Sequence, residues 1–525
     1  MESDLKSLEF DGIRRLLEKL AATPYGAEAC RNLAPAPSRD GARRRQAEGA
    51  AARPAIGAGD GPPLPELPDV RPALRQARTP GAALAVTALE NLRTLLGACS
   101  DLNDFLGRHP ELHPSGAGNL DLPGPLVARL DEVLSSSGTL REDASEELGR
   151  LHGERRSLGE EATEAVRKRQ DKRDLRDAVD DPKKVTWHGP RAAITLRATH
   201  ADGVKGVRRG TAMGGRDVII EPVEAVAVNN RLEAMDGRIQ AEEQRLLREV
   251  TDTVREHADT LDRLVTAITW VDLATAGAQL SIHLNAHAPI LADQPGLRLN
   301  EAYHPLLLLQ FAEGTGPQPV PLTIELDDTN RMLVITGPNT GGKTVVLKTL
   351  GLLVTMAHCG LHVPAEGECT IGAYDRVLVD VGDPQDLFHH LSTFAGHVEK
   401  LKRILDEADS STLVLMDELG TGTDPEEGAA LAMSVLDELS GRGVQGIVNT
   451  HLSPLKDYAE SAEYVVNASM RFDHDALAPT YQLAVGEPGR SLGLLIAERN
   501  GLAPELVGRA RDHLQRIARR PADAG

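Results

Sequence analysis

The spacing of apolar residues predicts a helical region over the first 140 residues. Residues 1–34 follow the period of an amphipathic helix, with apolar side chains at Leu5, Leu8, Phe10, Ile13, Leu16, Leu17 and Leu20. Helical spacing returns at 82–108 and at about 124–136. Between these segments, residues 35–70 are rich in Pro, Gly, Ala and Arg, so we expect an irregular connection there.

Two long charged segments follow, at about 140–180 and 222–268. Their apolar residues are sparse and their Glu and Arg content is high, which is typical of an antiparallel coiled-coil arm. The stretch between them has glycine breaks and alternating apolar residues, so it predicts a small β-structured tip at about 185–221. We therefore expect residues 141–270 to form an arm that carries this tip.

The remainder of the chain, 271–525, changes from about residue 296 to alternating strands and helices, which indicates a parallel-sheet α/β domain. Its most specific feature is a G-x-x-x-x-G-K-[ST] phosphate loop between an apolar strand and an apolar helix. The loop comprises Gly337, Pro338, Asn339, Thr340, Gly341, Gly342, Lys343 and Thr344. Backbone amides would bind phosphate oxygens, Lys343 would reach the β- and γ-phosphates, and Thr344 would ligate Mg²⁺. The loop predicts binding of a nucleoside triphosphate.

Two later segments supply the other groups that such a site needs. The apolar run Thr412–Met416 ends in Asp417 and Glu418, as expected for a buried strand that delivers acids at its carboxyl end. Asp417 would support Mg²⁺, and Glu418 would position and polarise the attacking water. A second strand, 444–449, is followed by Thr450 and His451. His451 could sense the γ-phosphate, although a lone histidine is more often structural.

Charge separates one part of the chain from the rest. The net charge of the chain is −20, and aromatic residues are only 3%, which argues against a protein that coats nucleic acid generally. Residues 183–221 nevertheless hold eight Lys or Arg against three Asp or Glu, a net charge of +5. We expect phosphate-backbone contacts there, from Lys205, Arg208, Arg209 and Arg216. The alternative is a solvated charged face.

The N-terminus lacks the apolar segment of a secretory signal, and no apolar run approaches membrane-spanning length. The four cysteines are scattered without a C-x-x-C pair. These features favour a cytoplasmic protein with no membrane partner.

Several motifs together resemble the MutS ATPases, in the form found in the bacterial MutS-two lineage. They are GPNTGGKT, HLSTFAGH, LVLMDELGTGTDPEEGAALA, the strand end Asn449–His451 and NASMRFD, and agreement extends to SLEFDGI at the N-terminus and IIEPVEAVAVNNRL in the arm. The resemblance covers nearly the whole chain. It implies a helical core and lever, a coiled-coil clamp arm with a β tip, and a C-terminal P-loop (ABC-like) ATPase domain that uses ATP and Mg²⁺.

The resemblance also implies a homodimer with composite nucleotide sites, in which Ser392 of one subunit contacts the γ-phosphate bound by the other. It implies that the dimer clamps double-stranded or branched DNA and restrains recombination. One alternative within the lineage is an ATPase that splits stalled or collided ribosomes through rRNA contacts. Another is a regulatory ATP-binding dimer with little turnover.

Two departures from the lineage matter. Its members usually continue into a C-terminal Smr nuclease domain, but this sequence contains no LDLHG or HG-x-G-T-G signature in a suitable context, so nuclease activity is not expected. The clamp tip usually carries an aspartate- and serine-rich turn, whereas this chain has RGTAMGGR at 209–216. Because of the second difference, the resemblance does not indicate which partner the tip binds.

Overall fold

The computed structural model describes residues 2–112, 120–172, 175, 178–179, 184–337, 341–381, 393–473, 478–489, 493–499 and 501–518. The chain divides into two compact units. The first comprises residues 1–63, 105–114 and 268–525, and the second comprises 64–104 and 115–267. Among the described residues, no helix is long and apolar enough to span a bilayer.

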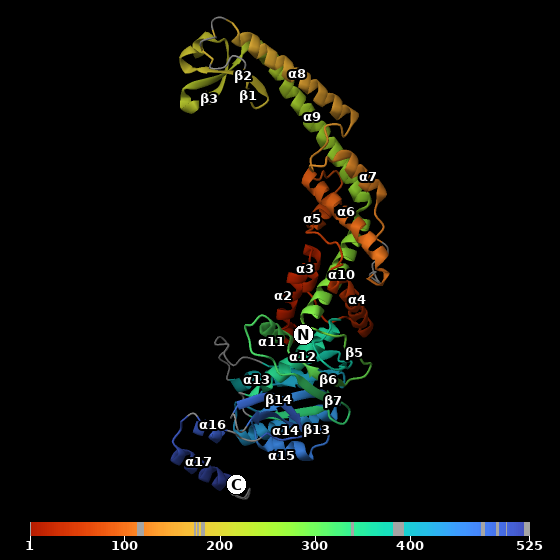
Figure 1. The fold of residues 1–525 in the computed structure, drawn as a ribbon, viewed down its shortest axis with the longest axis vertical. Coiled ribbons are helices and arrows are strands. Elements are labelled where there is room, and N and C mark those ends of the chain that lie inside the picture. The colour runs from red at the N-terminus through yellow and green to blue at the C-terminus, as the bar shows by residue number, and fades with distance from the viewer. Residues whose placement is uncertain are drawn as a thin grey trace. The chain divides into compact units, whose positions relative to one another are not determined.

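The N-terminal segment of the first unit forms three helices rather than the single helix that the spacing predicted. These are α1 (Glu2–Ser7), α2 (Phe10–Leu20) and α3 (Pro24–Arg31) (Figure 1). Glu9 adopts a left-handed conformation (φ 61°) that separates α1 from α2. Thr23 caps α3 by accepting a hydrogen bond from the Gly26 amide, and Pro24 occupies the first helical position. These local breaks interrupt a continuous apolar pattern.

The expectation of an irregular connection at 35–70 is wrong for its first half, because α4 spans Arg39–Gly57. Ser38 caps this helix by accepting a hydrogen bond from the Gly41 amide. Distant partners then hold the helix in place. The Gln46 side chain donates to the Pro289 carbonyl (2.9 Å). Tertiary contacts therefore outweigh the weak helix propensity of a Gly- and Pro-containing sequence.

The second unit begins with helices and continues into an antiparallel helix pair. Its helices are α5 (Arg71–Ala77), most of α6 (Val86–Arg108), α7 (Gly124–Val133), α8 (Glu146–Gln170), α9 (Val223–Glu256) and the start of α10 (Ala258–His283). α8 and α9 lie side by side in opposite directions, since Ser145 bonds Glu242 whereas Lys172 bonds Glu224. The observed helices differ in extent from the two long segments expected. α8 starts after its cap, Ser145, and α10 continues beyond 268 because its apolar face stays buried.

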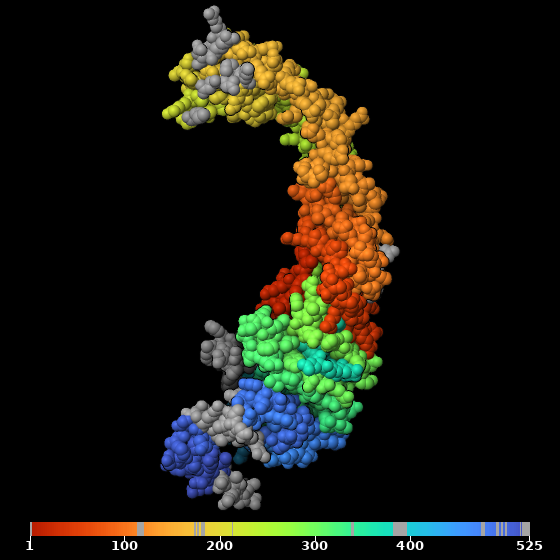
Figure 2. All heavy atoms as spheres, in the orientation of Figure 1, coloured from red at the N-terminus to blue at the C-terminus, as the bar shows by residue number. Residues whose placement is uncertain are grey.

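A four-stranded antiparallel sheet connects α8 to α9. Its strands are β1 (Thr186–His188), β2 (Arg191–Arg197), β3 (Gly206–Ala212) and β4 (Asp217–Pro222), in the order β1-β2-β4-β3. Alternate residues of β2 and β4, including Ile194 and Ile220, pack in one apolar cluster with Leu158 of α8 and Leu232 of α9. Figure 2 shows the helix pair and the sheet as one continuous packed body. The helix pair and the sheet therefore share a core.

The first unit contains a six-stranded sheet in the order β10-β11-β12-β8-β13-β14. Its strands are β8 (Met332–Thr336), β10 (Arg376–Asp380), β11 (Thr412–Met416), β12 (Gln445–Thr450), β13 (Val465–Asp473) and β14 (Ala478–Val485). All neighbouring pairs are parallel except β13–β14. This confirms the parallel-sheet α/β architecture predicted from the alternating pattern.

Helices cover both faces of this sheet. On one face, Leu333 and Ile335 pack against α12 (Lys343–His358). On the other, Met332 and Val334 pack with α14 (Pro425–Gly441) and α15 (Pro454–Ser461). The remaining described helices of this unit are α11 (Pro305–Ala312), α13 (Thr393–Glu407), α16 (Gly493–Arg499) and α17 (Pro504–Ala518). Both faces of the central strands β8, β11 and β12 are thus buried, which explains their largely apolar sequences.

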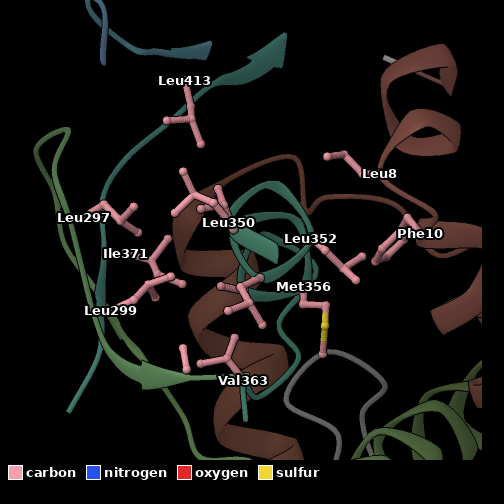
Figure 3. Close-up of a cluster of buried hydrophobic side chains, with 14 of the residues drawn as sticks. Leu8, Phe10, Leu297, Leu299, Leu350, Leu352, Met356, Val363, Ile371 and Leu413 are labelled. Atoms are coloured by element: carbon pink, nitrogen blue, oxygen red, sulfur yellow. The ribbon is translucent and has the colours of Figure 1, made fainter. Parts of the chain in front are cut away.

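Most residues of the helix α12 are buried, and Figure 3 shows apolar side chains of other elements packed around it. Leu350 lies near Leu413 of the main sheet, whereas Leu352 points toward Leu8 and Phe10. A second sheet contributes apolar residues to the same cluster. Its strands are β5 (Ile290–Leu291), β9 (Thr370–Ile371), β6 (Leu297–Ala302) and β7 (Leu322–Leu326). Close packing of these layers fixes the helix that starts at the phosphate loop.

Candidate nucleotide site

The phosphate loop lies at the carboxyl end of β8, in the middle of the six-stranded sheet. Gly342 is the capping residue before α12 and has φ 89°, a conformation that glycine adopts readily. The Lys343 side chain is 3% exposed, and its ammonium donates to the carbonyl oxygens of Gly337 and Thr450. Burial lowers the pKa of Lys343. The loop residues Pro338, Asn339 and Thr340 lie outside the described residues.

The strand order brings the two predicted metal-site residues together. Thr344 Oγ1 donates to Asp417 Oδ2 at 2.7 Å, although 73 positions separate them in the sequence. The strand β12 lies between β8 and β11, and its Asn449 donates from Nδ2 to Asp417 Oδ1 at 3.1 Å. The Asp417 amide donates to the Asp380 carbonyl at 2.9 Å. A hydroxyl and a carboxylate held in this way match the oxygen ligands that Mg²⁺ prefers.

Glu418 and His451 follow the ends of neighbouring strands. Glu418 adopts φ 54°, which is uncommon for a residue with a side chain and is often found at functional sites. The next amide, of Leu419, donates to the Asn449 carbonyl at 3.1 Å and ties this turn to β12. His451 is exposed and comes directly after Thr450, whose carbonyl accepts from Lys343. Both predicted catalytic residues therefore lie at the same sheet edge as the phosphate loop.

Ser392, expected to act across a dimer, lies outside the described residues, but the helix that follows it is α13. Asp380 anchors this helix, accepting from His397 Nδ1 at 3.1 Å and from Lys400 Nζ at 2.9 Å. Burial of Asp380 favours its neutral form, but these two hydrogen bonds prevail and lower its pKa. Arg403 of the same helix pairs with the buried Asp4 of α1. The start of α13 is therefore held at the carboxyl end of β10.

The sequence motifs included Asn449 at a strand end but gave it no role, and they did not single out Asp380. Each is a polar residue near the carboxyl end of a buried strand, and that position was the available signal. Nothing in the local sequence shows which strands become neighbours. Their contacts with Asp417 follow from the order β10-β11-β12.

The four predicted nucleic-acid contacts fall into two groups. The side chains of Lys205, Arg208 and Arg216 are exposed and have no hydrogen-bond or ion-pair partner among the residues that the structure describes. Arg209 instead donates from Nε to Glu221 Oε2 at 2.6 Å.

Glu221 is fully buried and also accepts from Arg191 Nη1 at 2.8 Å and from Asn229 Nδ2 at 2.9 Å. Arg209 therefore belongs to an internal charged cluster that holds the sheet on α9. Of the four predicted contacts, the other three are exposed.

A phosphate loop beside an acid-terminated parallel strand defines a P-loop nucleoside triphosphatase. Sequence comparison agrees, because residues 333–518 match the family described as MutS domain V, which is an ATPase domain. The chain is 38% identical to Endonuclease MutS2 of Thermus thermophilus over 97% of its own length and 66% of that protein. It is 36% identical to Endonuclease MutS2 of Symbiobacterium thermophilum over 99% of its length and 65% of that protein.

The chain belongs to the MutS family, in its MutS2 lineage. It spans about two thirds of the length of the curated relatives that it matches. The comparisons therefore confirm the resemblance that the motifs indicated.

Proposed function

We propose that this protein is an Mg²⁺-dependent ATPase whose nucleotide cycle controls its grip on DNA. The observation that carries the ATPase proposal is the contact of Thr344 with Asp417 beside the buried Lys343. These groups supply the hydroxyl, the carboxylate and the cation that a triphosphate and its metal require. The names of the relatives include an endonuclease activity, but our proposal for this chain covers only ATP hydrolysis and DNA binding.

Each residue of the site has a distinct role in this proposal. Lys343 and the loop amides bind the phosphates, and Thr344 and Asp417 would hold Mg²⁺, which when bound neutralises charge on the β- and γ-phosphate oxygens. Asn449 keeps the Asp417 carboxylate in position through its amide. Glu418 orients the attacking water and accepts its proton, and His451 contacts the γ-phosphate.

We further propose that the protein works as a homodimer. Membership of the MutS2 lineage supports this, and so does the anchoring of α13, which directly follows Ser392. In a composite site, Lys343 of one subunit and Ser392 of the other serve the same nucleotide.

The dimer can be tested by mixing two inactive proteins, Lys343→Ala and Ser392→Ala. One of the two sites in a heterodimer keeps both residues, so about a quarter of wild-type ATPase activity should return when half of the molecules are heterodimers. Activity should be measured after subunit exchange has been shown with differently tagged chains. Failure to recover activity despite proven exchange would contradict a composite site.

For DNA binding we propose that the exposed cations of the small sheet contact phosphates. Replacing Lys205, Arg208 and Arg216 with alanine removes up to three contacts. Each contributes about 0.9 to the slope of log K against log salt, so the slope should become shallower by up to about 2.7. The measurement is duplex affinity across a salt series.

Arg209 is left in place in this experiment because its loss would also remove a partner of the buried Glu221 and so disturb the structure. A charge-matched control replaces Arg15, Lys19 and Lys402, which are exposed cations of the first unit. We expect the control to keep the wild-type slope. Equal slopes for both variants and the wild type would show that the basic sheet is only a solvated face.

The finer role that we propose is clamping of branched DNA and restraint of recombination, which rests on membership of the MutS2 lineage. Sedimentation of native lysate, with and without nuclease treatment, tests this role. We expect the protein to leave the heavy fractions when DNA is digested. Cosedimentation with ribosomes that resists DNase would instead support the ribosome-directed alternative, and negligible turnover of the purified protein would support a regulatory ATP-binding dimer.

A further inference from the structure

One side of α13 carries three basic side chains at successive turns, and each of them contacts a buried acid. His397 and Lys400 bond to Asp380 of β10. One turn further along, Arg403 bonds to Asp4, which belongs to α1 and is 3% exposed. Residues three apart in a helix are neighbours on its surface. α13 is therefore held along one side, by β10 at its first half and by α1 at its second half.

The contact between Arg403 and Asp4 fixes direction as well as distance. Arg403 Nη2 donates to Asp4 Oδ1 at 2.6 Å, and Nη1 donates to Oδ2 at 3.2 Å. Two parallel bonds between a planar guanidinium and a carboxylate define the orientation of both groups, which a single bond does not. Since the Asp4 carboxylate is buried, salt screens this pair less than it would screen an exposed one.

Asp4 also binds the edge of the six-stranded sheet. β10 is the outermost strand on one side of this sheet, so the backbone groups on its outer side need partners other than a strand. The Val379 amide of β10 donates to Asp4 Oδ1 at 3.1 Å. The same carboxylate therefore joins α13 to β10, one residue before the Asp380 side chain that holds the first half of the helix.

The helix that carries Asp4 is itself fixed against the phosphate-loop helix. Leu5 of α1, and Leu8 directly after it, belong to the apolar cluster around α12. A Cβ atom built on Gly351 of α12 would collide with Leu8 Cδ2, so this leucine lies as close to the helix backbone as a glycine permits. Asp4 therefore has a defined place from which it can orient α13.

We infer that Asp4 is a positioning residue for ATP hydrolysis in the partner subunit, an inference that rests on the composite site proposed above. Ser392 immediately precedes α13 and serves the other subunit's nucleotide, so a contact that orients α13 acts on hydrolysis there. The phosphate loop of the same subunit keeps its own contacts, from Thr344 to Asp417 and from Lys343 to backbone carbonyls. A subunit without the Asp4 carboxylate should therefore still bind and hydrolyse ATP when its partner has an intact Asp4.

Heterodimers with a single working site separate the contributions of the two subunits. When a wild-type chain is paired with a Lys343→Ala chain, and the pair is isolated through two different tags, the working site combines Lys343 of the first chain with Ser392 of the second. Asp4→Asn is then placed in either chain. In the chain with intact Lys343 it should leave the ATPase rate at saturating Mg-ATP unchanged. In the Lys343→Ala chain it should lower this rate about 10- to 100-fold, since a misplacement of about 1 Å can cost up to about 10²-fold.

The chain offers a matched control in Asp11. This acid also pairs with an arginine, Arg14, but both residues lie in α2, so the pair does not reach α13. Asp11→Asn in the Lys343→Ala chain should keep the rate of the reference heterodimer. Arg403→Gln removes the other member of the Asp4 pair, so it should lower the rate only from the Lys343→Ala chain, as Asp4→Asn does.

The placement of the effect decides between the possible roles. An equal loss in both placements of Asp4→Asn, or a loss only in the chain with intact Lys343, would mean that Asp4 supports its own subunit. No loss in either placement would mean that the contact does not orient α13 for hydrolysis. Ser392→Ala, placed in the same two ways, tests the composite site separately, because it should abolish hydrolysis only from the Lys343→Ala chain. If Ser392→Ala shows no such dependence, the composite site is wrong, and the positioning role of Asp4 with it.

Discussion

Replacing Glu418 with glutamine should leave ATP binding intact and slow hydrolysis by about 10²- to 10⁴-fold. Glutamine keeps the shape of the side chain but cannot accept a proton from the attacking water, and loss of a general base has effects of this size. Glutamine is close to glutamate in size, so we expect it to keep the backbone conformation of this residue (φ 54°). The measurement is single-turnover hydrolysis together with ATP affinity.

Lys343→Ala provides the contrasting result, since it should abolish binding of the nucleotide. Lys343 is buried against two carbonyl oxygens, so its ammonium is fixed at the loop, and alanine cannot replace it. If Glu418→Gln hydrolyses ATP at the wild-type rate, the role of Glu418 is wrong and another group must activate the water.

Replacing Glu221 with glutamine should destabilise the second unit by about 3 kcal/mol, the cost typical of breaking a buried ion pair by removing one partner. Glutamine preserves the size of the side chain but leaves the guanidinium groups of Arg191 and Arg209 without their shared buried carboxylate. Chemical denaturation can be followed by the fluorescence of Trp187 in β1, in a Trp270→Phe background. Glu313→Gln, an exposed position in the first unit, is the control.

The same substitution should change how stability depends on pH. Burial of Glu221 favours its neutral form, but hydrogen bonds from Asn229, Arg209 and Arg191 outweigh this and lower the pKa of the carboxyl in the folded protein. The folded state thus gains stability above the ordinary pKa of glutamate, and this gain is lost as the pH falls through the lower, folded-state pKa. We expect the wild type to lose its advantage over Glu221→Gln below about pH 4. An equal difference in unfolding free energy at pH 7 and pH 3 would contradict this.

The amino-acid sequence was enough to identify the family, and it also predicts the chemistry of the nucleotide site. A phosphate loop needs glycines, a lysine and a hydroxyl in consecutive positions, so local order alone defines it. The strand that ends in Asp417 and Glu418 is equally local, because a continuous apolar run predicts a buried strand and its end predicts the sheet edge. For the same reason the helices at α6 and α7 coincide with the segments where the apolar spacing predicted them.

Contacts between residues that are distant in the sequence could not be predicted from local patterns. Thr344, Asp417 and Asn449 converge because β12 lies between β8 and β11, and no local pattern encodes that order. Composition predicted an irregular connection where α4 forms, because the contacts that stabilise this helix include a partner about 240 positions away in the sequence.

Two arginines of the small sheet show most clearly what local sequence cannot predict. Arg208 and Arg209 are adjacent and identical in type, but one is exposed and the other pairs with the buried Glu221. A count of charges treats them alike. Their environments differ because the pairing of β3 with β4 shifts register between Arg208 and Gly210, so Arg209 is an extra residue without a partner in the ladder. Its side chain reaches Glu221, and only the packed structure shows that contact.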